Sequence, residues 1–320
     1  MIERGLLPGE DELELVAQAR EVLAARAPVG RFRALRDAGQ TFDAELWTEL
    51  IGLGWGGIPF SEDDGGLGFG LPGLALVAEE AGRGLALLPL GSLAAAAARG
   101  DTSAIEGAVT ALAWREVARG DALHTRAEAG HLQGYKRDVD DLSAASSALV
   151  TTVQGVFQVE ITDDLRHARR RVDGRDAGDL RLDRVPGAPV DGDLVAARAA
   201  ADVIRCAEAL GAMSQVFELT RLWLLERRQF GVPIGSFQVL QHRAVDAWAS
   251  IELVRALVRQ ASLTPTPAVL AATRRKTAAV FLNVTKEAVQ MHGGIGVTEE
   301  CDVGLYLKRA LGCAAELYSG

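Results

Sequence analysis

The apolar residues of the first hundred positions recur at helical spacing. In the segment DELELVAQAREVLAARA, Leu13, Val16 and Val22 lie near one face of a helix. The segment TFDAELWTELIGLGW begins with a Thr/Asp capping signal and stops at glycine. A polar, glycine-rich loop, IPFSEDDGGLGFGLPG, comes next, and two more apolar helical segments follow it. We therefore expect a helical N-terminal domain over residues 1–107.

After about residue 108 the period changes from helical to alternating. The runs HLQGYKRDVDD, SALVTTV, GVFQVEITDD and LRLDRV are short, rich in β-branched residues and separated by Gly or Asp, as is typical of antiparallel strands. The basic cluster Arg166–Arg171 is flanked by acidic residues, which favours a solvated hairpin or strand edge. These runs predict a small antiparallel β domain over residues 108–190.

Helical spacing returns after residue 190. An apolar stripe of Val203, Cys206, Leu210, Met213 and Phe217 continues towards the segment LLERR, and predicts a helix of roughly 35 to 40 Å. Further helices are expected over about 237–262 and 266–292, and a short one closes the chain. The predicted fold is α+β and mainly α, with a C-terminal four-helix bundle over residues 191–320.

Composition narrows the functional classes. The 320 residues carry a formal charge of −9 without a lysine-rich run, which argues against nucleic-acid binding. The three cysteines, Cys206, Cys301 and Cys313, lie far apart without CxxC spacing, so we expect neither a disulfide framework nor a metal site. The acidic N-terminus lacks a signal-peptide pattern, and no apolar run approaches a membrane span. A cytoplasmic protein that does not bind a membrane is therefore expected.

The segment LLERRQFGVPIGSFQVLQH interrupts two helices with a polar, aromatic corner. Gly231, Pro233 and Gly235 suffice to end one helix and turn the chain into the next. On purely local grounds Arg227 would then face solvent and Phe230 would enter the core.

That local interpretation leaves the polar start of the following helix unexplained. Gln238 and Gln241 are spaced to share one face, on the side of the corner. Arginine and glutamines around an aromatic ring suit a planar ligand that carries phosphate. The corner is therefore a candidate binding site as well as a turn.

A second candidate is EAVQMHGGIGVTEE, where glycines follow a helix directly. Gly293 and Gly294 would let a phosphate approach the backbone, and Gln290 could donate a hydrogen bond to it. The glycines end a helix instead of opening one, so this is no Rossmann fingerprint, and a plain helix C-cap is the alternative.

The two segments together, in this order and spacing, resemble the acyl-CoA dehydrogenase family. LIGLGWGGIPFSEDDGGLGFGLPGLALVAEEAGR looks like its N-terminal region, and LQGYKRDVDDLSAASSALV looks like its G-x-K strand pair. The resemblance implies FAD as cofactor and conversion of an acyl-CoA thioester to the trans-2-enoyl-CoA. It also implies an FAD held between two subunits, contacted at its adenosine and pyrophosphate part by Arg227, Phe230, Gln238, Gln290, Gly293 and Gly294.

Two departures from the family pattern concern the chemistry. The middle domain reads ALAWREVARGD and RDVDDLSAAS where the family has its flavin-ring contacts, and it looks shortened. One family position for the catalytic base falls at Ala201, whose methyl group cannot accept a proton. Asp202, next to it, and Glu316, near the other family position, are the remaining candidates, and a surface or helix-end charge is the alternative for each.

A subset of this family, in actinobacterial steroid degradation, forms α2β2 heterotetramers in which one subunit lacks the base, and this chain resembles that subunit. The resemblance implies a catalytic acyl-CoA dehydrogenase partner and an acyl-CoA substrate, the acyl group being undefined. Two alternatives stay open: a self-sufficient homo-oligomeric enzyme with a relocated base, and a flavin-free structural or regulatory homologue.

Overall fold

The computed structural model describes residues 5–116, 123–191 and 194–319. Its chain forms two compact units, each described here by itself. The first comprises Met1–Ala34, Leu71–Ala86 and Asp202–Gly320, and the second comprises Leu35–Gly70 and Leu87–Ala201. The three-domain division along the chain, at residues 107 and 190, stays a prediction.

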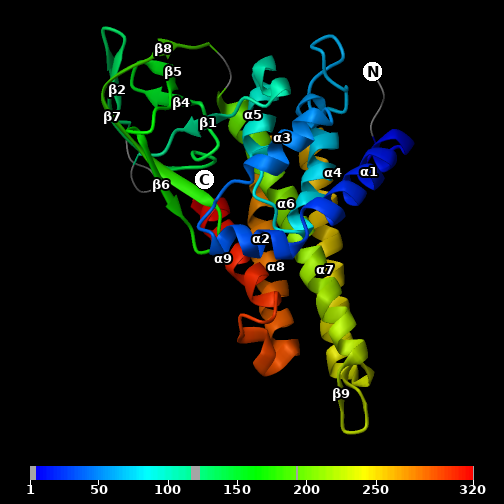
Figure 1. The fold of residues 1–320 in the computed structure, drawn as a ribbon. Helices are drawn as coiled ribbons and strands as arrows, with labels where there is room; N and C mark the ends of the chain where they lie inside the picture. The colour runs from blue at the N-terminus through cyan, green and yellow to red at the C-terminus, as the bar shows by residue number, and fades with distance from the viewer. Residues whose placement is uncertain (1–4, 117–122, 192–193, 320) are drawn as a thin grey trace. The chain divides into compact units, whose positions relative to one another are not determined.

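The first unit is helical. In it α7 packs along α8, and α8 packs along α9, which gives the C-terminal bundle (Figure 1). The predicted apolar stripe of α6 is confirmed in part: Val203, Cys206, Leu210 and Met213 are each at most 1% exposed, whereas Phe217 is half-buried. The helices wholly or partly in this unit are α1 (Glu10–Arg26), α2 (Val29–Asp37), α4 (Gly70–Arg83), α6 (Leu194–Glu226), α7 (Gln238–Leu263), α8 (Pro267–His292) and α9 (Val303–Ser319).

The ends of the long helices follow local sequence signals. Thr266 caps α8 by accepting a hydrogen bond from the amide of Val269, and Pro267 occupies the first turn, where its missing N–H costs nothing. Gly293, with φ of +67°, ends the same helix. The predicted spans of α7 and α8 therefore agree with the observed ones to within two residues.

Helices α4 and α6 cross at unusually short range. A methyl group at Gly211 would lie 1.7 Å from the carbonyl oxygen of Glu79, and one at Gly82 would lie 2.0 Å from that of Glu208. Only glycine fits at either position, because the two backbones themselves form the contact.

The second unit combines short helices with two four-stranded sheets. One sheet has the order β1-β4-β5-β8 and the other β2-β3-β7-β6. The elements are α3 (Ala44–Gly52), η1 (Trp55–Gly57), α5 (Leu90–Ala98), η2 (Thr102–Glu106), β1 (Thr110–Ala113), β2 (Arg126–Glu128), β3 (His131–Val139), β4 (Ser147–Thr152), β5 (Gly155–Glu160), β6 (Arg166–Arg170), β7 (Asp176–Pro186) and β8 (Ala188–Pro189).

Among the strands that the structure describes, the pairings are antiparallel apart from one. Strands β1 and β4 pair in parallel, with Thr110 opposite Ser147, because the β2–β3 hairpin lies between them in the chain and supplies the crossover that a parallel pair needs. The arginine-rich β6 pairs only with β7 in the described sheet and is an edge strand, which confirms the prediction for residues 166–171. The predicted fold class, mainly helical with a small β domain, is likewise confirmed. Among the described residues, no helix is long and apolar enough to cross a membrane.

Candidate cofactor-binding site

The polar corner after α6 is a tight β-hairpin. Strands β9 (Arg228–Gln229) and β10 (Val232–Pro233) pair in antiparallel fashion, and Phe230 and Gly231 form the two-residue turn between them (Figure 1). Both turn residues have positive φ, +52° and +82°, as a primed hairpin turn requires. Left-handed backbone is unfavourable for a bulky residue such as phenylalanine.

Phe230 points away from the core of its unit. It is 91% exposed, so the local prediction of a core residue is wrong. Its ring meets Phe237, which precedes α7, edge to face with centroids 6.2 Å apart. Gln241 donates to the carbonyl oxygen of Gly235 and so closes the turn into α7. The hairpin thus presents an aromatic surface that its own unit does not bury.

A stacked pair of rings joins this corner to the end of α8. Trp223, in the last turn of α6, stacks on His292 with centroids 5.2 Å apart and planes 16° apart. The guanidinium of Arg227 lies 5.7 Å from the centroid of the same indole. Because His292 immediately precedes Gly293, the structure brings the two candidate segments together in one unit.

His292 is suited to stacking in its neutral form. Its Nδ1 atom lies 2.8 Å from the carbonyl oxygen of Ala288, which can only accept, so this nitrogen carries the proton. Burial lowers the pKa of His292 from its ordinary value, against the opposing effect of that hydrogen bond. A neutral imidazole is therefore favoured against the indole.

The glycine pair after α8 leaves room for a ligand. A methyl group at Gly293 or Gly294 would meet no atom within 4 Å, so these glycines are not explained by packing. Gln290, one turn earlier, is exposed, as are Arg227 and Gln238. All six residues predicted to contact the cofactor are thus solvent-accessible in this unit.

The two candidate bases are paired with arginines in the first unit. Asp202 lies in α6 and is the first residue of this unit's C-terminal segment. Its carboxylate lies 3.4 Å from the guanidinium of Arg274 in α8. Glu316 of α9 is only 7% exposed and forms an ion pair with Arg205 of α6. Each carboxylate thus has an arginine partner within the unit. The geometry favours a structural role for both, and a catalytic role stays a hypothesis.

The second unit contains a buried ion pair that the sequence did not reveal. Lys136 of β3 is fully buried, and its Nζ atom lies 2.5 Å from Glu116 and 3.0 Å from Thr151. Burial opposes ionisation of Glu116, but hydrogen bonds from Lys136, Thr125 and His124 outweigh it and lower the pKa of Glu116 to about 2. Burial also lowers the pKa of Lys136, against its attraction to Glu116.

Glu116 belongs to the segment ALAWREVARGD, where flavin-ring contacts were sought. Trp114 of that segment has the guanidinium of Arg115 at 4.5 Å and that of Arg198 at 3.6 Å from its ring centroid. Residues 117–122 lie outside the described part of the chain. The described half of the segment is thus occupied by contacts within the chain.

Comparison with known proteins identifies the family. Residues 9–105 match the model of the acyl-CoA dehydrogenase N-terminal domain, and residues 199–315 match that of the acyl-CoA dehydrogenase C-terminal domain. Together these matches cover more than half of the chain. The chain belongs to the acyl-CoA dehydrogenase family, an oxidoreductase family whose cofactor is FAD, as the resemblance implied.

Individual relatives agree with this assignment. The chain is 41% identical over 131 residues to acyl-CoA dehydrogenase IpdE2 of Mycolicibacterium smegmatis, an alignment spanning 41% of this chain and 42% of that protein. The matched part is thus less than half of the length of that curated relative.

Solved structures match over almost the whole chain. A variant of the Tcur3481–Tcur3483 steroid acyl-CoA dehydrogenase superposes with a TM-score of 0.87 at 27% identity, covering 98% of this chain and 94% of that one. Butyryl-CoA dehydrogenase from Megasphaera elsdenii gives a TM-score of 0.84 at 19% identity, with 99% and 96% covered, which is a likeness of fold alone.

The described residues fit one part of FAD. An exposed aromatic ring, a cationic side chain and an open glycine pair suit adenine and pyrophosphate, which need stacking, positive charge and close backbone approach respectively. No such fit is found for the flavin ring among the described residues of ALAWREVARGD, where the Trp114 ring and Glu116 already have partners within the chain.

Proposed function

We propose that this chain is a subunit of a heteromeric acyl-CoA dehydrogenase and completes the FAD site of a catalytic partner subunit. The observation that carries the proposal is Phe230, an almost fully exposed phenylalanine held in left-handed backbone at a hairpin tip. Such a residue costs stability in the isolated chain, and a ligand or partner that covers it would offset that cost.

Each proposed contact uses a property of this chain's own residues. Phe230 would stack on adenine, and Arg227 would neutralise the pyrophosphate with charge-assisted hydrogen bonds. Gln238 and Gln290 would donate further hydrogen bonds, and Gly293 with Gly294 would admit a phosphate to the backbone. When bound, FAD supplies the acceptor for the hydride that leaves the β-carbon of the acyl thioester.

The α-proton must be removed by a carboxylate, and we assign that carboxylate to the partner. In this chain Ala201 stands at one family position, and the carboxylates nearest to the two positions, Asp202 and Glu316, are neutralised by Arg274 and Arg205. The paired name of the Tcur3481–Tcur3483 relative is compatible with a two-component enzyme.

The substrate class of the proposed enzyme is an acyl-CoA thioester. The Tcur3481–Tcur3483 relative is named a steroid acyl-CoA dehydrogenase, which supports a steroid-derived acyl group as the first substrate to test. The cytoplasm is the proposed compartment, because the three cysteines lie too far apart in sequence to suggest a disulfide framework.

Purification with and without a partner tests the proposal. We expect the chain produced alone to be colourless, and a complex co-expressed with a full-length acyl-CoA dehydrogenase from the same gene cluster to be yellow and to reduce a dye with acyl-CoA. Flavin and activity in the chain alone would establish the self-sufficient enzyme instead. A colourless chain that forms no complex would favour the flavin-free homologue.

A further inference from the structure

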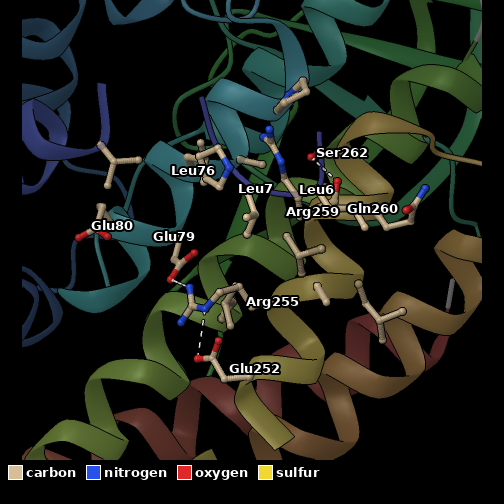
Figure 2. A pocket seen from close by; sticks show the side chains of 18 of the residues that line it. Leu6, Leu7, Leu76, Glu79, Glu80, Glu252, Arg255, Arg259, Gln260 and Ser262 are labelled. Atoms are coloured by element: carbon tan, nitrogen blue, oxygen red, sulfur yellow. Dashed lines mark hydrogen bonds and ion pairs between the residues drawn. The ribbon is translucent and has the colours of Figure 1, made fainter. Parts of the chain in front are cut away.

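A cavity of about 720 Å³ lies between α1, α4 and α7 in the first unit (Figure 2). None of its lining residues belongs to the hairpin or to the end of α8. Apolar side chains from all three helices line it, and Leu210 of α6 contributes to the wall. Cavities that bind small molecules commonly measure a few hundred to a thousand cubic ångströms and are mostly apolar. This one, named here the α1–α4–α7 cavity, has the size and the lining of such a site.

Each charged side chain of the wall forms an ion pair, with another wall residue or, for Arg259, with Glu12. Figure 2 shows Arg255 of α7 between Glu79 of α4 and Glu252, and both carboxylates form ion pairs with it. On the other side Arg20 binds both oxygens of Glu80, at 3.0 and 2.9 Å. The remaining charged residues of the lining, Arg83 and Arg259, are ion-paired as well.

This pairing determines the kind of ligand that the cavity can accept. A charged group placed inside would lose its hydration and would compete with ion pairs that are already satisfied. A neutral molecule with a large hydrocarbon surface meets no such penalty and gains from removal of apolar area from water. The wall therefore selects against charge.

A buried ion pair fixes the mouth of the cavity. Arg259 of α7 and Glu12 of α1 are both nine-tenths buried or more and are joined by two hydrogen bonds of 3.0 and 2.6 Å. Arg259 also donates to the carbonyl oxygen of Gly5 at 3.2 Å. These bonds hold the segment Leu6–Pro8 at the cavity, with Leu6 beside Arg259 in Figure 2.

The rim of the cavity exposes apolar surface that a ligand would cover. Leu7 is 83% exposed and Leu6 is 61% exposed, although both line the cavity. Leu13 of α1 and Leu253 of α7 are about half exposed on the same lining. Four leucines around one opening form a surface whose burial by an apolar ligand would contribute to binding.

We propose that the α1–α4–α7 cavity is a binding site for a neutral, hydrocarbon-rich small molecule, separate from the proposed FAD site. The proposal does not depend on the proposed function, since neither Arg227 nor the glycine pair lines this cavity. It rests on the volume of the cavity, the ion pairing of its charged side chains and the segment held at its rim.

Two fluorescent probes with closely related aromatic frameworks test the selection against charge. N-phenylnaphthylamine is neutral, and anilinonaphthalene sulfonate adds a sulfonate to that framework. We expect the full chain to bind the neutral probe saturably with one site, and the sulfonate much more weakly. Dodecanol should displace the neutral probe, whereas dodecanoate at the same concentration should not.

A pair of variants locates the site. Ala256 lines the cavity and is exposed, so Ala256→Trp can place a large ring in the opening without disturbing the core. Ala249, two turns earlier on α7, is also exposed and does not line the cavity, so Ala249→Trp is the matched control. We expect Ala256→Trp to weaken binding by about tenfold or more, because its ring occupies the site, and Ala249→Trp to leave binding unchanged.

Three results would overturn the proposal. The first is non-saturable binding or equal binding by both variants, which would indicate general surface adsorption. The second is equal affinity for the two probes, which would remove the charge selection. The third is loss of probe binding when a partner subunit is added, which would identify the cavity as part of a protein interface.

Discussion

Glu316 and Arg205 form an ion pair between α9 and α6, with the carboxylate almost fully buried. A structural role and a catalytic role of Glu316 predict different effects on stability and on reaction rate. If it is structural, Glu316→Gln should lower the free energy of unfolding by about 1–3 kcal/mol, because Arg205 keeps a poorly hydrated charge without its counter-ion. Dye reduction by the assembled enzyme should be unchanged.

Urea unfolding and acyl-CoA-dependent dye reduction, measured on the same preparation, separate these roles. A catalytic base should cost about 100-fold or more in rate when neutralised. Asp202→Asn tests the second candidate base in the same way, since Asp202 pairs with Arg274 but is more exposed than Glu316. A large loss of rate in either variant would show that the substituted carboxylate is the catalytic base, and that this chain supplies it.

Arg227 is expected to contribute to FAD binding through its charge. Arg227→Ala should weaken FAD binding by about 10- to 150-fold, since a hydrogen bond to a charged group is worth about 1.5–3 kcal/mol. Arg228→Ala is the control: the neighbouring guanidinium is also exposed, and its hydrogen bond is to Gly231 of its own hairpin. The flavin-to-protein ratio of the co-expressed complex measures both, and equal ratios would count against the assignment.

The Trp223–His292 stack should matter for FAD only by holding the two segments together. Trp223→Leu keeps an apolar side chain but removes the stack, which is worth about 0.5–1.5 kcal/mol, so FAD binding should weaken by roughly three- to tenfold. Far-UV circular dichroism should show the helices intact. Trp248→Leu removes an exposed tryptophan elsewhere on α7 and should leave FAD binding as it is. Equal effects of the two variants would contradict a positioning role.

Replacing Phe230 is expected to affect the stability of the chain and the binding of FAD in opposite directions. Asparagine adopts left-handed backbone more readily than phenylalanine, a conformation that costs most residues about 1–2 kcal/mol. Phe230→Asn should therefore keep or raise the melting temperature of the chain while lowering the flavin content of the complex. A fall in both would show instead that the Phe230–Phe237 contact supports the hairpin.

The Glu116–Lys136 pair predicts a specific response to acid. The pKa of Glu116 is about 2 in the folded chain, against about 4.3 for an unfolded glutamate. The contribution of Glu116 to the free energy of unfolding is therefore fully present at pH values above its pKa in the unfolded chain. This contribution is lost as the pH falls from about 5 towards 2. Glu116→Gln should remove this acid dependence and cost about 3–5 kcal/mol at neutral pH, by leaving Lys136 buried without its partner.

Denaturant unfolding across this pH range measures the effect. The double variant Glu116→Gln/Lys136→Met is the control, because replacing both members of a buried pair is often far less costly than breaking it. An acid profile of Glu116→Gln that matches the unmodified chain would show that another group is responsible.

The helices could be predicted because their signals are local. Amphipathic spacing and the Thr266–Pro267 start set the limits of α8, and neither depends on distant residues. The parallel β1–β4 pair could not be predicted in this way, since pairing direction depends on how the chain crosses between strands.

The arrangement of the candidate site could not be predicted from the sequence, and its membership stays a prediction. The stack of Trp223 on His292 joins residues far apart in the sequence, and no local pattern indicates it. The exposed position of Phe230 follows from a turn conformation that phenylalanine disfavours, so propensity pointed to the core. Lys136 offered a signal for the Glu116–Lys136 pair. A lysine that a strand directs into the interior needs a carboxylate partner, so an acidic residue near Lys136 could have been expected.

The two glycines at the α4–α6 crossing have a consequence for the charged side chains of α4. Because backbone meets backbone there, the crossing sets how closely α4 approaches α6 and which way it is rotated about its own axis. That rotation determines where Glu79 and Glu80 stand relative to Arg255 and Arg20. The charge pattern of the α1–α4–α7 cavity is thus aligned by two residues that carry no side chain.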